Sequence, residues 1–330
     1  MNNKLLLISI LITIAIIITF IASLIYGSVY VPIRYLFRHE YPYSFIIYQI
    51  RFPTSISTLF IGADLAVSGL ILQKLLKNPL MDPYISGTSS GAAFGATLSY
   101  IFLLFGIPLA YIFYIAPLTA FLFASIATLI TILIGKSGDV YRLVIAGIAV
   151  SYIFSSLIMF EISILQEKVP ELPSVYFWIF GYINYINYTE MVLTVVISLI
   201  FLAFAMKYAR IIDLVAISDE MSFAHKVNPN RFRLLWVLAI SLLISMIISF
   251  TGIIGFVGLM TPHLVRGFLG GRSSYTEIPY VAMMGGMILL VSKIISKGAF
   301  GFTVPITAVT AILAFPIIIY VLVRRIGVSQ

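Results

Sequence analysis

The sequence predicts an all-α fold, a polytopic transmembrane helical bundle. The chain has 330 residues, of which 61% are hydrophobic and 10% are charged, whereas about a quarter of the residues in a soluble domain are charged. Its mean hydropathy is +1.11. The apolar runs approach the roughly 20 residues that a helix needs to cross a bilayer. They do not alternate with polar residues, as barrel strands would. Helices satisfy their own backbone groups in lipid, so these runs favour a helical bundle.

Polar residues, glycine and proline separate about ten expected spans. In chain order they are 5–27, 54–76, 87–105, 110–134, 141–163, 190–208, 234–251, 256–269, 278–297 and 304–323. The first run is longer than the 7–15-residue core of a typical signal peptide, and no cleavage-site pattern follows closely, so we expect a retained helix. The whole chain, 1–330, is expected to form a single transmembrane domain.

Basic residues indicate how the bundle is oriented. Ten spans place both termini on one side of the membrane. That side carries fourteen of the 20 Lys and Arg residues: Lys4, Lys74, Lys77, Lys136, Arg142, Lys207, Arg210, Lys226, Arg231, Arg233, Arg266, Arg272, Arg324 and Arg325. The other six are Arg34, Arg38, Arg51, Lys168, Lys293 and Lys297. Cytoplasmic loops are enriched in Lys and Arg, so we expect both termini in the cytoplasm and a multi-pass protein of the cell (plasma or inner) membrane.

Composition excludes several kinds of site. The absence of Cys removes disulfides, thiolate chemistry and cysteine-ligated metals. The three histidines, His39, His225 and His263, lie far apart without metal-ligand spacing, so no metal site is expected. The net charge of +8 fits basic loops beside anionic lipid, and we expect no nucleic-acid partner.

The longest polar interruption between apolar runs is residues 213–233, DLVAISDEMSFAHKVNPNRFR. Seven of its side chains are ionisable or His: Asp213, Asp219, Glu220, His225, Lys226, Arg231 and Arg233. The positive-inside rule places this loop in the cytoplasm. In so apolar a chain, such a loop indicates a surface that a soluble partner binds.

Two patterns resemble catalytic motifs but lack their context. Gly87-Thr88-Ser89-Ser90-Gly91 matches the nucleophile elbow G-x-S-x-G, yet it opens an apolar helix instead of joining a strand to a helix. A membrane serine protease using Ser89 or Ser90 with His263 is kept as the less favoured alternative. Gly135-Lys136-Ser137 resembles the end of a phosphate-binding loop, but Ile130 stands where a Walker A motif requires Gly. We therefore expect no catalytic residue.

Small residues form stripes on two expected helices. One stripe contains Gly87, Gly91 and Gly95, and the other contains Gly62 and Ser68. Small side chains let helix backbones approach closely in lipid, and close packing is the simpler interpretation. The alternative is that Gly62, Ser68, Gly87, Ser89, Ser90 and Gly91 line a translocation path.

Asp64 is the one acid that we place well inside a span. An ionisable group there is costly and is by default a functional hypothesis. Two interpretations stay open: Asp64 faces a water-filled path, or it pairs with a polar neighbour for structural reasons. The first would suit an ion-coupled secondary transporter.

Several segments, in order and spacing, together resemble a known family. They are Arg51-Phe52-Pro53, GADLAVSGLILQ (62–73), NPLMDPYISGTSSGAAFGA (78–96), LVIAGIAVSYIFSSL (143–157), WIFGYIN (178–184), ISDEMSFAHKVNPNRFRLL (217–235) and GIIGFVGLMTPHLVR (252–266). Over nearly its whole length the chain is similar to the permease subunits of type II ATP-binding-cassette importers. Those importers carry iron–siderophore chelates, haem and cobalamin.

The resemblance implies the partners. It implies a homodimer of ten-helix permease domains with the path at the two-fold interface, two separate ATPase subunits that bind ATP and Mg, and a substrate-binding protein outside. This chain would bind no cofactor itself and would be a transport subunit, not an enzyme. The loop matches the family's coupling segment through Ser218, Asp219, Glu220, Met221, Ala224, Val227 and Asn228.

The resemblance also implies basic residues that meet acidic side chains of the binding protein. Arg51 matches one of these. Lys297 stands where Arg is usual, which keeps the charge but loses bidentate pairing, and Thr54 stands where a second Arg is common. Arg34 and Arg38 are the further candidates for docking. The substrate cannot be read from the sequence, and an iron chelate is preferred only because that class is the most frequent.

Overall fold

The computed structural model describes residues 3–38, 40–135, 140–168, 181–183, 185–298 and 302–326, and these form helices and turns with no strand among them. The expected all-α fold is confirmed. His39, Lys136, Ser137 and most of the segment 178–184 lie outside the described residues. The chain divides into two compact units, each built from segments far apart in the sequence. The expectation of a single transmembrane domain stays a prediction.

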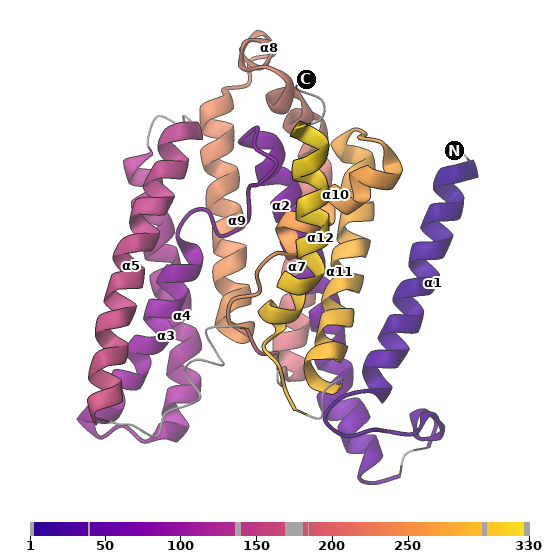
Figure 1. Ribbon diagram of the computed structural model, residues 1–330, viewed down its shortest axis with the longest axis vertical. Helices are drawn as coiled ribbons and strands as arrows, with labels where there is room; N and C mark the ends of the chain where they lie inside the picture. Colours follow the sequence, from indigo (N-terminus) through magenta and orange to yellow (C-terminus); the bar gives the residue numbers. More distant parts are fainter. Residues whose placement is uncertain are drawn as a thin grey trace. The chain divides into compact units, whose positions relative to one another are not determined.

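The first unit comprises Met1–Ile71, Ile183–Asp213 and Gly255–Gln330. Its helices are α1 (Asn3–Ile25), the short η1 (Ile33–Leu36), the π-helical η2 (Phe45–Arg51), α2 (Phe52–Leu75), α7 (Tyr188–Ile217), α10 (Val257–Leu269), α11 (Ser274–Gly298) and α12 (Ile306–Ile326). The last turns of α2 and α7 belong to the second unit. Helix α11 contacts α1, α10 and α12 (Figure 1), which makes it a central element of this unit.

The second unit comprises Leu72–Tyr182 and Leu214–Ile254. Its helices are α3 (Thr88–Ile101), the short η3 (Phe102–Phe105), α4 (Leu109–Ile134), α5 (Val140–Lys168), α8 (Asp219–Ala224) and α9 (Pro229–Thr251). Helices α3 and α4 pack against each other and against both α5 and α9 (Figure 1). Phe94, Phe123 and Phe154 fill the space between α3, α4 and α5, with ring centroids 4.8 and 5.4 Å from that of Phe94.

The number of spans is close to the expected ten. Among the described residues, 8 helices are long and apolar enough to cross a membrane, and they include eight of the expected runs. The other two expected runs are α12 and α10. Helix α10 has 13 residues and at 1.5 Å per residue is shorter than the ~30 Å hydrocarbon core. Helix α7 is longer than expected, so Arg210 lies on a helix and not in a loop.

The small-residue stripes are sites of close helix packing, as expected. A Cβ atom added to Gly62 would lie 2.4 Å from the carbonyl oxygen of Gly285 in α11. In the second unit, a Cβ on Gly91 would lie 2.5 Å from the carbonyl oxygen of Phe123 in α4. Real Cβ atoms do not approach this closely, so only glycine permits these backbone contacts.

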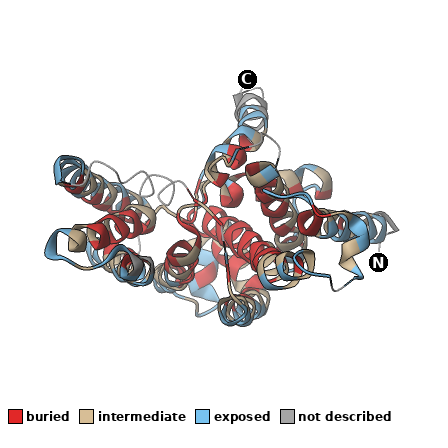
Figure 2. Cartoon of the chain, turned by 90° about the horizontal axis from the view of Figure 1, so that it is seen from below, coloured by how far each residue is buried: buried red, intermediate tan, exposed pale blue. Residues whose placement is uncertain are grey.

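Helix α1 exposes most of its apolar side chains. Leu7, Leu11, Ile14 and Ile18 are all about half-exposed or more, and the helix is drawn mainly in the exposed and intermediate colours (Figure 2). In a multi-pass membrane protein, such a face contacts lipid or another apolar surface. Most of the buried residues of the first unit come instead from α2, α7, α10 and α11.

Candidate functional site

The segment between α7 and α9 is shorter than the expected loop 213–233. Helix α7 continues to Ile217 and α9 begins at Pro229, so only residues 218–228 connect them. Asp213 lies on α7, where its carboxylate accepts hydrogen bonds from the backbone N–H and hydroxyl of Ser274 (2.8 and 2.6 Å) at the start of α11. Asp213 therefore caps a helix of the first unit, and the candidate site begins at Ser218.

Local hydrogen bonds define the short helix α8 within this connection. The Ser218 hydroxyl accepts from the backbone N–H of Met221 at 3.2 Å, which makes Ser218 the N-cap. Asn228 caps α9 in the same way by accepting from Arg231 N–H at 3.1 Å, and Pro229 follows at the first helical position, which proline favours. Because both helix starts are capped, at Ser218 and at Asn228, the connection between α7 and α9 has little conformational freedom.

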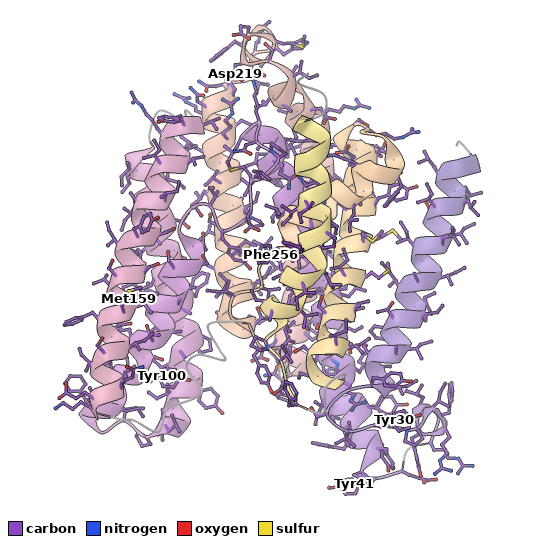
Figure 3. All side chains as sticks on the ribbon, viewed as in Figure 1. Tyr30, Tyr41, Tyr100, Met159, Asp219 and Phe256 are labelled. Atoms are coloured by element: carbon purple, nitrogen blue, oxygen red, sulfur yellow. The ribbon has the colours of Figure 1, made fainter. Side chains whose placement is uncertain are left out.

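Asp219 is the centre of an ion network that holds α8 (Figure 3 marks this residue). Its two carboxylate oxygens accept from the two terminal nitrogens of Arg233, at 2.6 and 2.8 Å. One of them also accepts from the Lys77 ammonium at 2.9 Å. A two-pronged guanidinium–carboxylate pair fixes orientation as well as distance.

Arg233 connects Asp219 to neighbouring helices of the second unit. Its side chain is 3% exposed, its Nε donates to the carbonyl oxygen of Leu75 at 2.9 Å, and one terminal nitrogen also donates to Asn230 at 3.2 Å. Leu75 is the last residue of α2 and Arg233 lies on α9. The network thus joins α8, α9 and the end of α2 into one locally rigid assembly. Sequence reasoning placed Arg233 and Lys77 only in the charge count and missed this role.

The network stays charged over the physiological pH range. Hydrogen bonds from Arg233, and then those from Lys77, lower the pKa of Asp219 from its ordinary 3.8 to about 2. A group whose pKa is lower in the folded state stabilises that state above its unfolded pKa. The contribution of this ion pair is therefore complete above pH of about 4 and is lost as the pH falls through 2.

The outer face of α8 is exposed and partly apolar. Glu220, Met221, Ala224 and Asn228 are exposed and Val227 is half-buried. Phe223 is 56% exposed and Ile217 is 68% exposed, although neither was among the expected coupling residues. Large apolar side chains on a polar connection outside the spans are typical of a contact surface for a partner. The signal available in the sequence was a large apolar residue, Phe223, within a mostly polar segment.

The expected docking residues fall into two groups. Arg34 and Arg38 are exposed; Arg34 lies over the ring of Tyr35 and Arg38 is 3.8 Å from Glu40. Arg51 is buried, and its guanidinium donates to the carbonyl oxygens of Leu24 (2.8 Å), Ile25 (2.7 Å) and Val29. Arg51 therefore caps the end of α1, and its guanidinium is not displayed on the surface. Lys297 lines a cavity beside Arg51.

Most of the expected path residues are packed inside their own unit. Gly62, Ser68, Gly87 and Gly91 are buried, whereas Ser89 and Ser90 are half-buried. Burial favours the packing interpretation for the first four over a path lining. The Ser90 hydroxyl donates to the carbonyl oxygen of Gly87 at 2.9 Å, and no strand precedes α3 in the described part of the chain. The segment thus lacks the strand-to-helix turn of a nucleophile elbow.

Asp64 has a polar neighbour, as one of the two interpretations expects. The Ser198 hydroxyl of α7 donates to it at 2.5 Å, and Asp64 is 1% exposed. It is not the only acid buried in a span, however. Glu161 of α5 is 4% exposed and accepts from the Thr97 hydroxyl of α3. The sequence expectation missed Glu161 because it lies near the end of the run 141–163, whereas α5 continues to Lys168.

Comparisons with known proteins point to one family. Residues 15–324 match the FecCD transport family. The Fe(3+)-citrate import system permease protein YfmD of Bacillus subtilis is 30% identical over 83% of this chain and 80% of its own length. The molybdate import system permease protein MolB of Haemophilus influenzae is 27% identical over 82% of this chain and 79% of its own. A solved metal-chelate type ABC transporter in an inward-facing conformation is 27% identical, with a TM-score of 0.80 over 95% of this chain and 97% of that one.

Proposed function

The chain belongs to the FecCD transport family, and we propose that it is the membrane-spanning permease of an ATP-binding-cassette importer for a metal chelate. In this proposal two copies form a homodimer around the translocation path. Two ATPase subunits bind on the cytoplasmic side, and a substrate-binding protein delivers the chelate outside. The chain hydrolyses nothing itself. An iron chelate is the preferred cargo, with haem and cobalamin as the other candidates.

One observation carries the proposal beyond family membership: the exposed helix α8 is fixed by the network of Asp219, Arg233 and Lys77. A partner that moves α8 would move the start of α9 and the end of α2 with it, because Arg233 bonds to Asp219 and to the Leu75 carbonyl. A short helix held this way can transmit a rigid-body shift to the neighbouring helices, whereas a flexible loop would change its own conformation instead. The apolar side chains of Met221 and Phe223 would supply the buried part of the contact.

Reconstituted vesicles test the proposed function. The purified chain, with and without an ATP-binding-cassette ATPase subunit, is incorporated into vesicles and supplied with the substrate-binding protein and labelled ferric citrate, haem or cobalamin. We expect accumulation only when the ATPase, ATP and Mg are present on the α8 side. Uptake driven by a proton gradient without an ATPase would favour the ion-coupled alternative. Proteolysis that is abolished by Ser89→Ala or Ser90→Ala would favour a protease.

The proposed docking surface predicts a salt-dependent effect. Replacing both Arg34 and Arg38 by Glu is expected to lower the association rate of the substrate-binding protein about tenfold or more at low salt, because exposed charges steer encounter. The effect should shrink as salt screens the charges. Surface plasmon resonance at two ionic strengths measures it.

The matched control for docking is Arg231→Glu, which reverses an exposed charge in the expected cytoplasmic segment. This control should leave the association rate of the substrate-binding protein unchanged. Equal capture by the Arg34/Arg38 variant and the control would refute docking by these two residues.

A further inference from the structure

Three cationic side chains line one cavity of the first unit. The cavity lies where the end of α1, η2, the start of α2 and the end of α11 meet, and its volume is about 250 Å³. Arg51, Lys293 and Lys297 line it, and none of the described residues that line it is acidic. Lys293 is 6% exposed and Arg51 is 8% exposed. Apolar side chains such as Ile46 and Ile50 form much of the remaining wall.

In their charged forms, the buried Arg51 and Lys293 side chains are costly to keep in this cavity unless an anion enters it. Burying a charge away from water costs free energy unless an opposite charge compensates it. Like charges that line the same cavity also repel each other, and the apolar wall screens them poorly. An anion in the cavity would remove both costs at once.

The two buried cations are held in place and keep donors for a ligand. A guanidinium has five N–H donors, and Arg51 uses three in its bonds to the carbonyl oxygens of Leu24, Ile25 and Val29. An ammonium has three donors, and Lys293 uses one on the Ser55 hydroxyl at 2.8 Å. Ser55 in turn accepts from Ser23 of α1 at 2.9 Å. These bonds fix the heads of both cations without neutralising either charge.

We propose that this cavity binds a phosphate group, carried by an anionic phospholipid or present as the free ion. A phosphate offers several acceptor oxygens to donors from three directions. A water molecule occupies about 30 Å³, so the cavity has room for a phosphate and some of its waters. The position of the cavity suits a lipid source, because the cavity adjoins Tyr26 at the end of the exposed apolar helix α1, and aromatic residues gather at head-group level. The inference does not depend on the proposed function.

The experiment compares ligands and variants of the purified full-length chain. Thermal unfolding is followed in neutral detergent with sodium phosphate against sodium chloride at equal ionic strength. A second arm uses nanodiscs of phosphatidylglycerol against phosphatidylcholine, with native mass spectrometry to count retained lipid. The variants are Lys293→Gln and Lys297→Gln. Lys207→Gln, which removes an exposed charge on α7, is the matched control.

We expect phosphate-dependent stabilisation in at least one arm, and each cavity variant should weaken binding about tenfold or more while the control does not. A response to phosphatidylglycerol alone identifies the lipid as the source, and a response to sodium phosphate identifies the free ion. If Lys293→Gln does not fold, the test uses Lys297→Gln and Lys297→Arg instead. Lys297→Arg keeps the positive charge and should retain phosphate binding, whereas Lys297→Gln should lose it. No response in either arm, or a response equal in the cavity variants and the control, overturns the proposal.

Discussion

Replacing Asp219 by Ala is expected to abolish coupled uptake while the two helical units stay folded. The change removes the partner of the buried Arg233 and frees Lys77. Removing one partner of a fully buried ion pair lowers the free energy of unfolding by about 3–5 kcal/mol. Asp219 is 34% exposed, so solvent screening reduces the cost here to about 1–3 kcal/mol. This is enough to release α8 from α9 and from the end of α2, but too little to unfold a bundle built on apolar packing.

Two rates measured in the same vesicles check this expectation. ATP hydrolysis by the bound ATPase should continue, and chelate uptake per ATP should fall about tenfold or more, since 1.4 kcal/mol corresponds to a factor of ten. The control is Arg210→Gln, which neutralises an exposed charge on the neighbouring helix α7 and leaves the Asp219–Arg233 pair intact. It should retain most of the coupling. Normal uptake by the Asp219→Ala protein would show that the network has no part in transmission.

The sequence was sufficient for the fold class and for most of the spans. Apolar runs of membrane length have few structural alternatives, and the glycines at 62, 91 and 95 marked close helix contacts correctly. The ends of the spans were less predictable. Arg210 and Asp213 were expected in a loop, yet they lie on α7, because a helix can continue beyond the lipid where polar side chains find partners.

The candidate site was predictable in position but not in its internal bonding. The residue types between Ser218 and Asn228 indicated a polar helix outside the membrane. That Asp219 pairs with Arg233, 14 residues later, depends on how α8 folds back on α9, and no local pattern encodes it. Arg51 is a similar case: its charge suggested docking, while its three bonds to the end of α1 follow only from the tertiary fold.

Replacing Gly69 by Val is expected to destabilise the first unit strongly. A Cβ atom at Gly69 would lie 2.0 Å from the carbonyl oxygen of Gly258 and 2.5 Å from its carbonyl carbon. Both obstacles are backbone atoms of α10, so no side-chain rotation relieves the clash and the helices must separate. Overpacking of this kind costs about 1–3 kcal/mol and occasionally more. The thermal unfolding midpoint in detergent, and the yield of monodisperse protein, should both fall.

Gly267→Val is the matched control, because it adds the same side chain to a helical glycine of the same unit. No atom lies within 4 Å of a Cβ atom built on Gly267, so the control measures the general effect of removing a glycine from a helix. Valine is a better helix former than glycine, and the control should unfold at the wild-type temperature or slightly above it. Equal midpoints for the two variants would mean that α2 and α10 do not approach at Gly69 and Gly258. In that case the close backbone contact, and with it the argument that glycine is required there, would be wrong.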